Sequence, residues 1–550
     1  VLLMFLYRLG GPELFEPDEG RNAEKARAIL LLSDWITPHE NFHAVLDKPI
    51  FFYWLIALSY KLFGVSEWAA RLPSALAAFG SLLVVYFFVR RWWGEWEARW
   101  SVLILATSAG FFAFSRIVIF DMTLTAFITL ALWAFYQAAH ESEPTAGWGT
   151  CALLYIALGA ATLTKGLVGL VVPGMIIFFH LLLTNSWRVL GKIHLPAGAV
   201  LFLLVVTPWY VLAETHNPGY LRYYLWEEHF GRFVTTKFNR SNPWYYYLYV
   251  APLGLLPWTF LLPATIKNFW RRRPDDKTLW LILWAALPIL FFSLSKAKLP
   301  QYILPSFPAL AILIGVSLPR ALSEAQDRCR FGFSAGWAIL SSLFIYSIAG
   351  VIRPEVLPEI VRGRFDSIVI LFTASAAISL ALAYLHGNRT LWAKLSPRYV
   401  FLTQCAGLLC FVVTLAEMMV LIAPARSAKE IAEKALPFLS PTTQMVSYDT
   451  YAEGLGFYLK TEKPVWVVTH SKKKSTFLGN FYAITGRPEP ISPLGEGLLT
   501  FEEFRDIWHS SATPLVILVK EKNLRGLERL VGATLKKVAA SDEYLIVMRP

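Results

Sequence analysis

The residues best suited to chemistry gather in one polar segment, residues 16–54, between two hydrophobic runs. Its candidate groups are acids, bases and imidazoles: Asp18, Glu19, Glu24, Asp47, Arg21, Lys25, Arg27, Lys48, His39 and His43. Charged side chains held close to a bilayer are costly unless they are used. We therefore expect this segment to contribute acids and bases to an active site.

Four further segments place charged or aromatic polar residues beside hydrophobic runs. They supply Arg116, Asp121, Lys165, Glu228, His229, Arg232, Lys296, Lys298 and Tyr302. Two other interpretations stay open. Asp18 and Asp121 could be N-caps of helices. The lysines could bind lipid headgroups at helix ends.

His39-Glu40-Asn41-Phe42-His43 fits the HExxH pattern of zinc proteases. That chemistry needs both imidazoles on one face of a helix, with the glutamate as base. Pro49 limits the length of any helix here, and the segment is not apolar. The sequence therefore favours ordinary loop histidines, and leaves open a metal bound for another purpose.

The elements that must position these residues are mostly hydrophobic. Of the 550 residues 56 % are hydrophobic and only 16 % are charged, against roughly 25 % charged in soluble domains. About twelve apolar runs are long enough to cross a bilayer, and Val1–Leu9 adds the expected end of a first helix. This predicts a polytopic α-helical membrane protein with about 13 transmembrane helices. The runs are 66–89, 101–115, 118–138, 151–163, 167–183, 196–213, 248–266, 279–294, 303–318, 335–352, 367–385 and 399–423.

Alternate short loops are rich in Lys and Arg, which predicts that these loops lie on the inner side of the membrane. The strongest indication is the run Arg271–Arg273. Segment 16–54 then faces the outer side, as does the region after residue 424. Several bases nevertheless fall in outer loops, which suggests an anionic ligand there. The net charge of +12 suits anionic lipid better than nucleic acid, and we expect no nucleic-acid partner.

Two parts of the chain are not predicted to span the membrane. Residues 16–64 contain two expected amphipathic pieces on the outer side, 21–35 and 50–63, the second being too short to span. After residue 423, strand-like and helical runs alternate, which predicts a small soluble α/β domain. The expected strands are 445–448, 465–469, 515–519 and 544–548, and the expected helices are 428–436, 501–508 and 524–530. We therefore expect a transmembrane catalytic domain at 1–424 and an α/β domain at 425–550. The four cysteines indicate no disulfide or metal framework.

The motifs PDEGRNAEKA, DWITPHEN, LDKPIFFYW, SRIVIFDM, TKGLVGLVVPG, EEHFGRF and SKAKLPQYILP follow one another in order. In these the chain resembles membrane glycosyltransferases of the protein-mannosyltransferase superfamily, which have the GT-C fold. It is most similar to bacterial 4-amino-4-deoxy-L-arabinose lipid A transferases. The resemblance implies an inner-membrane enzyme with a periplasmic active site and α/β domain. It also implies a sugar donor on undecaprenyl phosphate and lipid A as acceptor, with a gain in polymyxin resistance.

The resemblance also implies roles for the candidate residues. Direct displacement with inversion would use Asp18, Asp121 and Glu19 as catalytic or orienting acids, and Glu228 and His229 would position substrate. The phosphates would be bound by Lys48, Arg21, Arg116, Lys165, Arg232, Lys296, Lys298 and Tyr302. We expect no required cofactor, although a divalent metal near the outer acids and histidines stays open, and we expect a monomer.

Three alternatives remain at this point. A related enzyme could move another sugar, or use a protein or lipid hydroxyl as acceptor. A lipid or oligosaccharide transporter should instead show inverted repeats and broken helices near the bilayer midplane. A structural scaffold would leave the clustered acids and bases unexplained.

Overall fold

The computed structural model describes residues 1–141, 147–231, 242–270, 274–324, 326–351, 365–470, 497–511, 513–541 and 544–549. These residues form two compact units. Unit 1 comprises residues 1–9, 72–208 and 229–419, and unit 2 comprises residues 10–71, 209–228 and 420–550. The expected division of the chain at residue 424 stays a prediction. The Arg271–Arg273 run and Arg232 lie outside the described residues.

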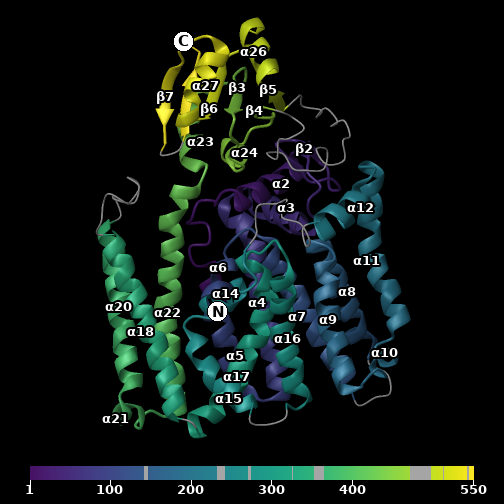
Figure 1. Cartoon of the computed structure of the whole chain (residues 1–550), viewed down its shortest axis with the longest axis vertical. Coiled ribbons are helices and arrows are strands. Elements are labelled where there is room, and N and C mark those ends of the chain that lie inside the picture. The colour runs from purple at the N-terminus through teal and green to yellow at the C-terminus, as the bar shows by residue number, and fades with distance from the viewer. Residues whose placement is uncertain are drawn as a thin grey trace. The chain divides into compact units, whose positions relative to one another are not determined.

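Unit 1 is built from helices, and Figure 1 shows its long members side by side. Helices α18 and α20, α7 and α8, and α5 and α17 pack against each other. Its elements, some of which continue into unit 2, are α1 (Leu2–Leu6), α4 (Glu67–Trp92), α5 (Glu95–Thr107), α6 (Ala109–Phe114), α7 (Phe120–Ala139), α8 (Trp148–Lys165), α9 (Val168–Thr184), α10 (Val189–Lys192), α11 (Leu195–His216), η1 (Tyr223–Gly231), α14 (Tyr246–Gly254), η2 (Trp258–Leu261), α15 (Leu262–Trp270), α16 (Asp276–Leu294), η3 (Pro300–Ser306), α17 (Phe307–Glu324), α18 (Gln326–Val351), α20 (Phe365–Gly387), α21 (Arg389–Trp392) and α22 (Pro397–Ile422).

Among the described residues, seven helices are long and apolar enough to cross a membrane. One bent pair would make an eighth. The expected run 248–266 forms that pair, bent by 104° between α14 and the helical segment Trp258–Lys267. Pro252 and Pro257 lie in or beside the bend, and proline lacks the N–H that a continuous helix needs. Run 101–115 is likewise divided between α5 and α6. The total of about 13 spans stays a prediction.

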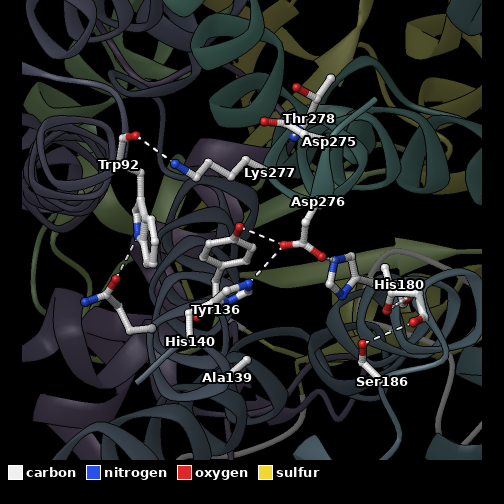
Figure 2. Close-up of polar contacts among 12 residues, drawn as sticks. Trp92, Tyr136, Ala139, His140, His180, Ser186, Asp275, Asp276, Lys277 and Thr278 are labelled. Carbon is white, nitrogen blue, oxygen red and sulfur yellow. Dashed lines mark hydrogen bonds and ion pairs between the residues drawn. The ribbon is translucent and has the colours of Figure 1, made fainter. Parts of the chain in front are cut away.

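One end of unit 1 contains a polar network that the sequence did not suggest (Figure 2). The carboxylate of Asp276, in the first turn of α16, accepts hydrogen bonds from the Tyr136 hydroxyl at 2.8 Å and from His140 and His180 at 3.0 Å each. Neighbouring Lys277 donates to the carbonyl of Trp92 at 3.1 Å. These contacts join the ends of α4, α7, α9 and α16.

Unit 2 contains a six-stranded sheet of order β5-β4-β3-β6-β8-β7. Strands β3 to β6 are parallel, and β8 and β7 add an antiparallel edge. The expected strands and helices are present, whereas β5 and β7 were not predicted. The elements of unit 2 are α2 (Asp18–Leu32), β1 (His39–Glu40), β2 (His43–Ala44), α3 (Phe51–Phe63), α12 (Tyr220–Arg222), η4 (Ala423–Arg426), α23 (Lys429–Ala435), η5 (Leu436–Phe438), β3 (Gln444–Tyr448), α24 (Leu455–Leu459), β4 (Trp466–Thr469), β5 (Leu498–Thr500), α26 (Phe501–Ser510), β6 (Leu515–Lys520), α27 (Glu521–Val531), β7 (Lys536–Ala540) and β8 (Tyr544–Met548).

The central strands of this sheet are buried on both faces, which explains their continuous apolar sequences. Helices α26 and α27 cover one face, and α23 and α24 cover the other. Thr500 begins α26 with a capping box, in which its hydroxyl accepts from the Glu503 N–H and the Glu503 carboxylate accepts from the Thr500 N–H. The expected α/β arrangement after residue 423 is therefore present.

Candidate active site

The predicted site residues divide between the two units. Unit 2 contains Asp18, Glu19, Arg21, Lys48 and Glu228. Unit 1 contains Arg116, Asp121, Lys165, Lys296, Lys298 and Tyr302. The backbone of His229 belongs to η1 of unit 1, but its side chain is outside the described part, as is all of Arg232.

Helix α2 begins at Asp18, and Pro17 holds its N-cap position. The alternative interpretation of Asp18 as the N-cap residue is therefore wrong. Its side chain is half-buried in the first turn, where the helix dipole stabilises a carboxylate. Asp18 therefore lies in the first turn of α2 and is not its N-cap residue.

Glu19 is buried, and its two oxygens accept hydrogen bonds from Arg71 at 2.9 and 2.8 Å. Arg71 is itself fully buried and also donates to the carbonyls of Pro12 and Glu13. Glu19 also accepts from the N–H of Phe15 at 3.0 Å. In this structure the pair fixes the chain that enters α2, a role that the sequence did not suggest for Glu19.

Lys48 is held by two acceptors, the Asp47 carbonyl at 2.7 Å and the Glu228 carboxylate at 3.3 Å. Glu228 is buried and also accepts from the Tyr223 hydroxyl at 3.0 Å. These contacts orient the Lys48 ammonium while leaving 17 % of its side chain exposed. An anion could therefore approach a cation whose position is already set.

The predicted phosphate ligand Arg21 forms an ion pair with Glu453 and lies 3.6 Å from Glu40. Lys25, one helical turn further along α2, is fully buried between Asp47 at 3.1 Å and Glu40 at 3.5 Å. In unit 2 the bases of α2 are therefore neutralised by carboxylates. Sequence reasoning missed Glu453 because it lies more than 400 residues away from Arg21.

The HExxH segment is not a helix. His39–Glu40 and His43–Ala44 pair as a two-stranded antiparallel hairpin, and Asn41 and Phe42 have positive φ angles of 49° and 67° at its turn. The two imidazoles therefore cannot lie on one helix face, and the zinc-protease interpretation is wrong. Across the described residues, no group of three His, Cys, Asp or Glu side chains is arranged to hold a metal ion.

In unit 1 the Asp121 carboxylate forms an ion pair with Lys165. The Lys165 ammonium also lies 4.3 Å from the centre of the Tyr302 ring, a distance that gives a cation–π interaction. The N-cap of α7 is Ile119, so the N-cap interpretation of Asp121 is also wrong. Lys165, at the end of α8, thus contacts two other predicted residues, Asp121 in the first turn of α7 and Tyr302 in η3.

The other predicted bases of unit 1 differ in exposure. Arg116 is buried and donates to the carbonyls of Phe5 at 2.9 Å and Tyr7 at 2.6 Å. Lys298 is buried and donates to the carbonyls of Asn242 and Ser295. Burial, together with the charge of Lys296, lowers the pKa of Lys298. Lys296 is exposed, so of these three it is the base most open to a ligand.

The chain is similar to known proteins in sequence and in fold. Residues 47–211 match the family model described as dolichyl-phosphate-mannose-protein mannosyltransferase. The undecaprenyl phosphate-alpha-4-amino-4-deoxy-L-arabinose arabinosyl transferase of Pseudomonas paraeruginosa is 34 % identical over 330 residues, 59 % of each protein. A second transferase of that name, from Pseudomonas fluorescens, is 30 % identical over 380 residues, 68 % of this chain and 67 % of the relative. The match to the Pseudomonas paraeruginosa protein thus spans about three fifths of the relative's length, as do several other such matches.

Solved structures extend the likeness along the whole chain. The crystal structure of ArnT from Cupriavidus metallidurans bound to undecaprenyl phosphate has a TM-score of 0.83 and 26 % identity, and the match covers 100 % of this chain and 96 % of that one. The same protein in its apo state gives a TM-score of 0.82. Fold and comparisons together define a multi-pass membrane protein of the GT-C glycosyltransferase class. The chain belongs to the family of undecaprenyl phosphate-alpha-4-amino-4-deoxy-L-arabinose arabinosyl transferases.

Proposed function

We propose that this protein transfers 4-amino-4-deoxy-L-arabinose from undecaprenyl phosphate to a phosphate of lipid A, at the periplasmic face of a bacterial inner membrane. The observation that carries the proposal is the likeness along the whole chain to a protein solved with undecaprenyl phosphate bound. The product carries an added amino group, which lowers the negative charge of lipid A and favours resistance to polymyxin.

The leaving group explains why lysines are needed. As the bond between C1 of the sugar and the phosphate oxygen breaks, its electron pair passes to that oxygen, and the charge on undecaprenyl phosphate rises. Lys48, held by Glu228, and the exposed Lys296 would stabilise this charge as it develops.

The acceptor explains why no strong base is needed. A lipid A phosphate is ionised at neutral pH, and one of its oxygens can attack C1 directly from the face opposite the leaving group. The configuration at C1 is then inverted. Asp18 and Asp121 would orient the sugar by accepting from its hydroxyls and its cationic amino group. We also propose that the enzyme acts as a monomer and needs no cofactor.

Replacing Asp18 by Asn should lower the rate of transfer while leaving the stability of the folded protein nearly unchanged. We expect kcat for transfer to fall by about a hundredfold, because a misplaced reacting group costs on that order. Tm should change little, since Pro17 and not Asp18 holds the N-cap position. Released undecaprenyl phosphate, quantified by mass spectrometry, measures turnover.

Asp506→Asn is the matched control, because Asp506 is an exposed acid of α26 far along the chain. It should leave turnover unchanged. An Asp18→Asn enzyme that turns over like wild type would remove Asp18 from the reaction, although the proposed transfer itself would stand if wild type performs it.

A further inference from the structure

The segment between β3 and β4, in the C-terminal α/β region of unit 2, contacts the start of α2. Both oxygens of Glu16 accept hydrogen bonds from this segment, from the N–H of Glu453 at 2.8 Å and of Gly454 at 2.7 Å. The N–H of Glu16 itself donates to the carbonyl of Arg426 at 2.8 Å. The residue that precedes Pro17 and Asp18 is therefore held on its backbone and on its side chain.

The two backbones approach so closely that only glycine fits. A Cβ atom added to Gly20 would lie 2.6 Å from the nitrogen and 2.8 Å from the Cα of Gly454. A Cβ added to Gly454 would lie 2.5 Å from a carboxylate oxygen of Glu16 and 3.3 Å from the Cα of Gly20. Gly454 has φ −81°, a conformation open to any residue. Its requirement for glycine is therefore one of space and not of backbone conformation.

Charged and polar side chains continue the contact along α2. Arg21 pairs with Glu453. Arg27, held by Glu24 at 2.7 Å, donates to the carbonyl of Thr461 at 2.9 Å. A buried network of this kind fixes a geometry, because each group left without its partner would be costly.

The hairpin after α2 is fixed in the same way. The Asn41 side chain donates to the carbonyl of Val465 at 2.7 Å and accepts from its N–H at 2.8 Å. This reciprocal pair occupies both polar groups of the residue just before β4. The C-terminal region thus contacts both ends of the segment that contains Asp18 and Lys25.

We propose that Glu453 and Gly454 are positioning residues for the transfer reaction: they fix the start of α2, and with it Asp18. The C-terminal α/β region would then contribute to catalysis through α2 without touching substrate. This inference rests on the proposed function for its kinetic consequence. Its structural part, that residues 453–454 hold α2 in place, can be tested without measuring enzyme activity.

Gly454→Ala in the full-length protein is the direct test, with Gly526→Ala as the matched control. A Cβ at Gly526, within α27 of the same region, would meet no atom within 4 Å. We expect Gly454→Ala to raise hydrogen exchange of the α2 amides at least about tenfold. Exchange of β3 and β6 should stay unchanged. We expect kcat to fall at least about tenfold with KM little changed, because orientation and not binding is lost.

Gly526→Ala should match wild type in exchange and kcat. A folded Gly454→Ala protein with wild-type exchange in α2 and wild-type kcat would overturn the proposal. Where Gly454→Ala does not fold, Glu453→Gln assayed at pH 9 decides, since above the pKa of Glu453 it removes the charge opposite Arg21 and keeps both N–H groups on Glu16. A wild-type kcat in Glu453→Gln would then overturn it. Wild type without transfer activity would instead reject the proposed function and leave the exchange comparison intact.

The carboxyl groups of this contact also predict a pH dependence of stability. Burial, reinforced by Glu40 and Glu16 and opposed by Arg21, raises the pKa of Glu453 to about 8. Burial raises the pKa of Glu16 to about 7, against the stabilising effect of the Gly454 and Glu453 N–H groups and of Arg21. The ordinary pKa of both groups is near 4.5. Between that pH and the raised pKa values, the folded state therefore binds more protons than the unfolded state. The free energy of unfolding should therefore fall as the pH rises from about 5 to about 8.

Tm measured across this range tests the sign. Glu453→Gln should have a smaller drop in Tm between pH 5 and pH 8 than wild type, because Gln cannot ionise. Glu462→Gln, at an exposed glutamate of the same region, should keep the full drop. Equal pH dependence in all three proteins would show that Glu453 does not titrate in this window.

Discussion

Replacing Lys48 by Met should lower kcat for sugar transfer by about 10²–10³-fold, the typical cost of losing one group that stabilises charge in the transition state. The structure supports an effect of this size on kcat, because the Asp47 carbonyl and the Glu228 carboxylate hold Lys48 before any ligand arrives. A cation that is already oriented needs little reorganisation as the leaving phosphate gains charge.

Lys61→Met is the matched control for Lys48→Met. Lys61 is an exposed lysine in the last turn of α3, so its loss changes net charge equally without removing an oriented cation. Single-turnover rates for the two variants separate the chemical step from product release. A Lys48→Met enzyme with more than about a tenth of the wild-type rate would contradict the assigned role.

Arg71→Met should destabilise the folded protein by about 3–5 kcal/mol, the usual result of breaking a buried ion pair on one side. The reason is that Glu19 would keep a buried negative charge without its guanidinium, and the Pro12 and Glu13 carbonyls would lose their donor. Thermal unfolding in detergent with lipid measures the loss as a lower Tm.

Arg90→Met in the same helix provides the comparison. Its ion pair with Glu95 is exposed on both sides, and such pairs contribute about 0–1 kcal/mol. Adding Glu19→Gln to Arg71→Met should recover part of the loss, because the unpaired charge is then removed. A double variant no more stable than Arg71→Met would show that the charge is not the source of the effect.

The sequence predicted a mostly helical membrane protein and several buried strands, because a bilayer and a buried parallel sheet both require continuous apolar runs. The total number of spans stays a prediction. The piece 50–63 is α3, and the strands at 445–448, 465–469, 515–519 and 544–548 are present with small changes of boundary. Short edge strands such as β5 and β7 were missed, since three to five residues carry little pattern of their own. The run 248–266, expected to form one span, is instead a bent helix pair with Pro252 and Pro257 in or beside the bend.

The site was predicted in part. Lys165 contacts both Asp121 and Tyr302, although the three residues belong to different elements, α7, α8 and η3. Their roles in the reaction stay predictions. The partners of Glu19 and Arg21 were not predictable from local spacing. Arg71 lies in an apolar run and Glu453 in the C-terminal region, so only the folded chain shows that they neutralise residues of α2. The HExxH pattern misled because a five-residue match says nothing of backbone conformation, and here the turn residues have positive φ.

The most direct test of the proposed transfer uses the full-length protein in detergent with lipid, 4-amino-4-deoxy-L-arabinosyl undecaprenyl phosphate as donor, and lipid A as acceptor. Mass spectrometry of lipid A should show the gain of one aminoarabinose, and none on lipid A whose phosphates have been removed enzymatically. Folded protein with intact donor and no mass gain on lipid A would contradict the proposed function. A gain on dephosphorylated lipid A would instead identify a hydroxyl acceptor and contradict direct attack by phosphate.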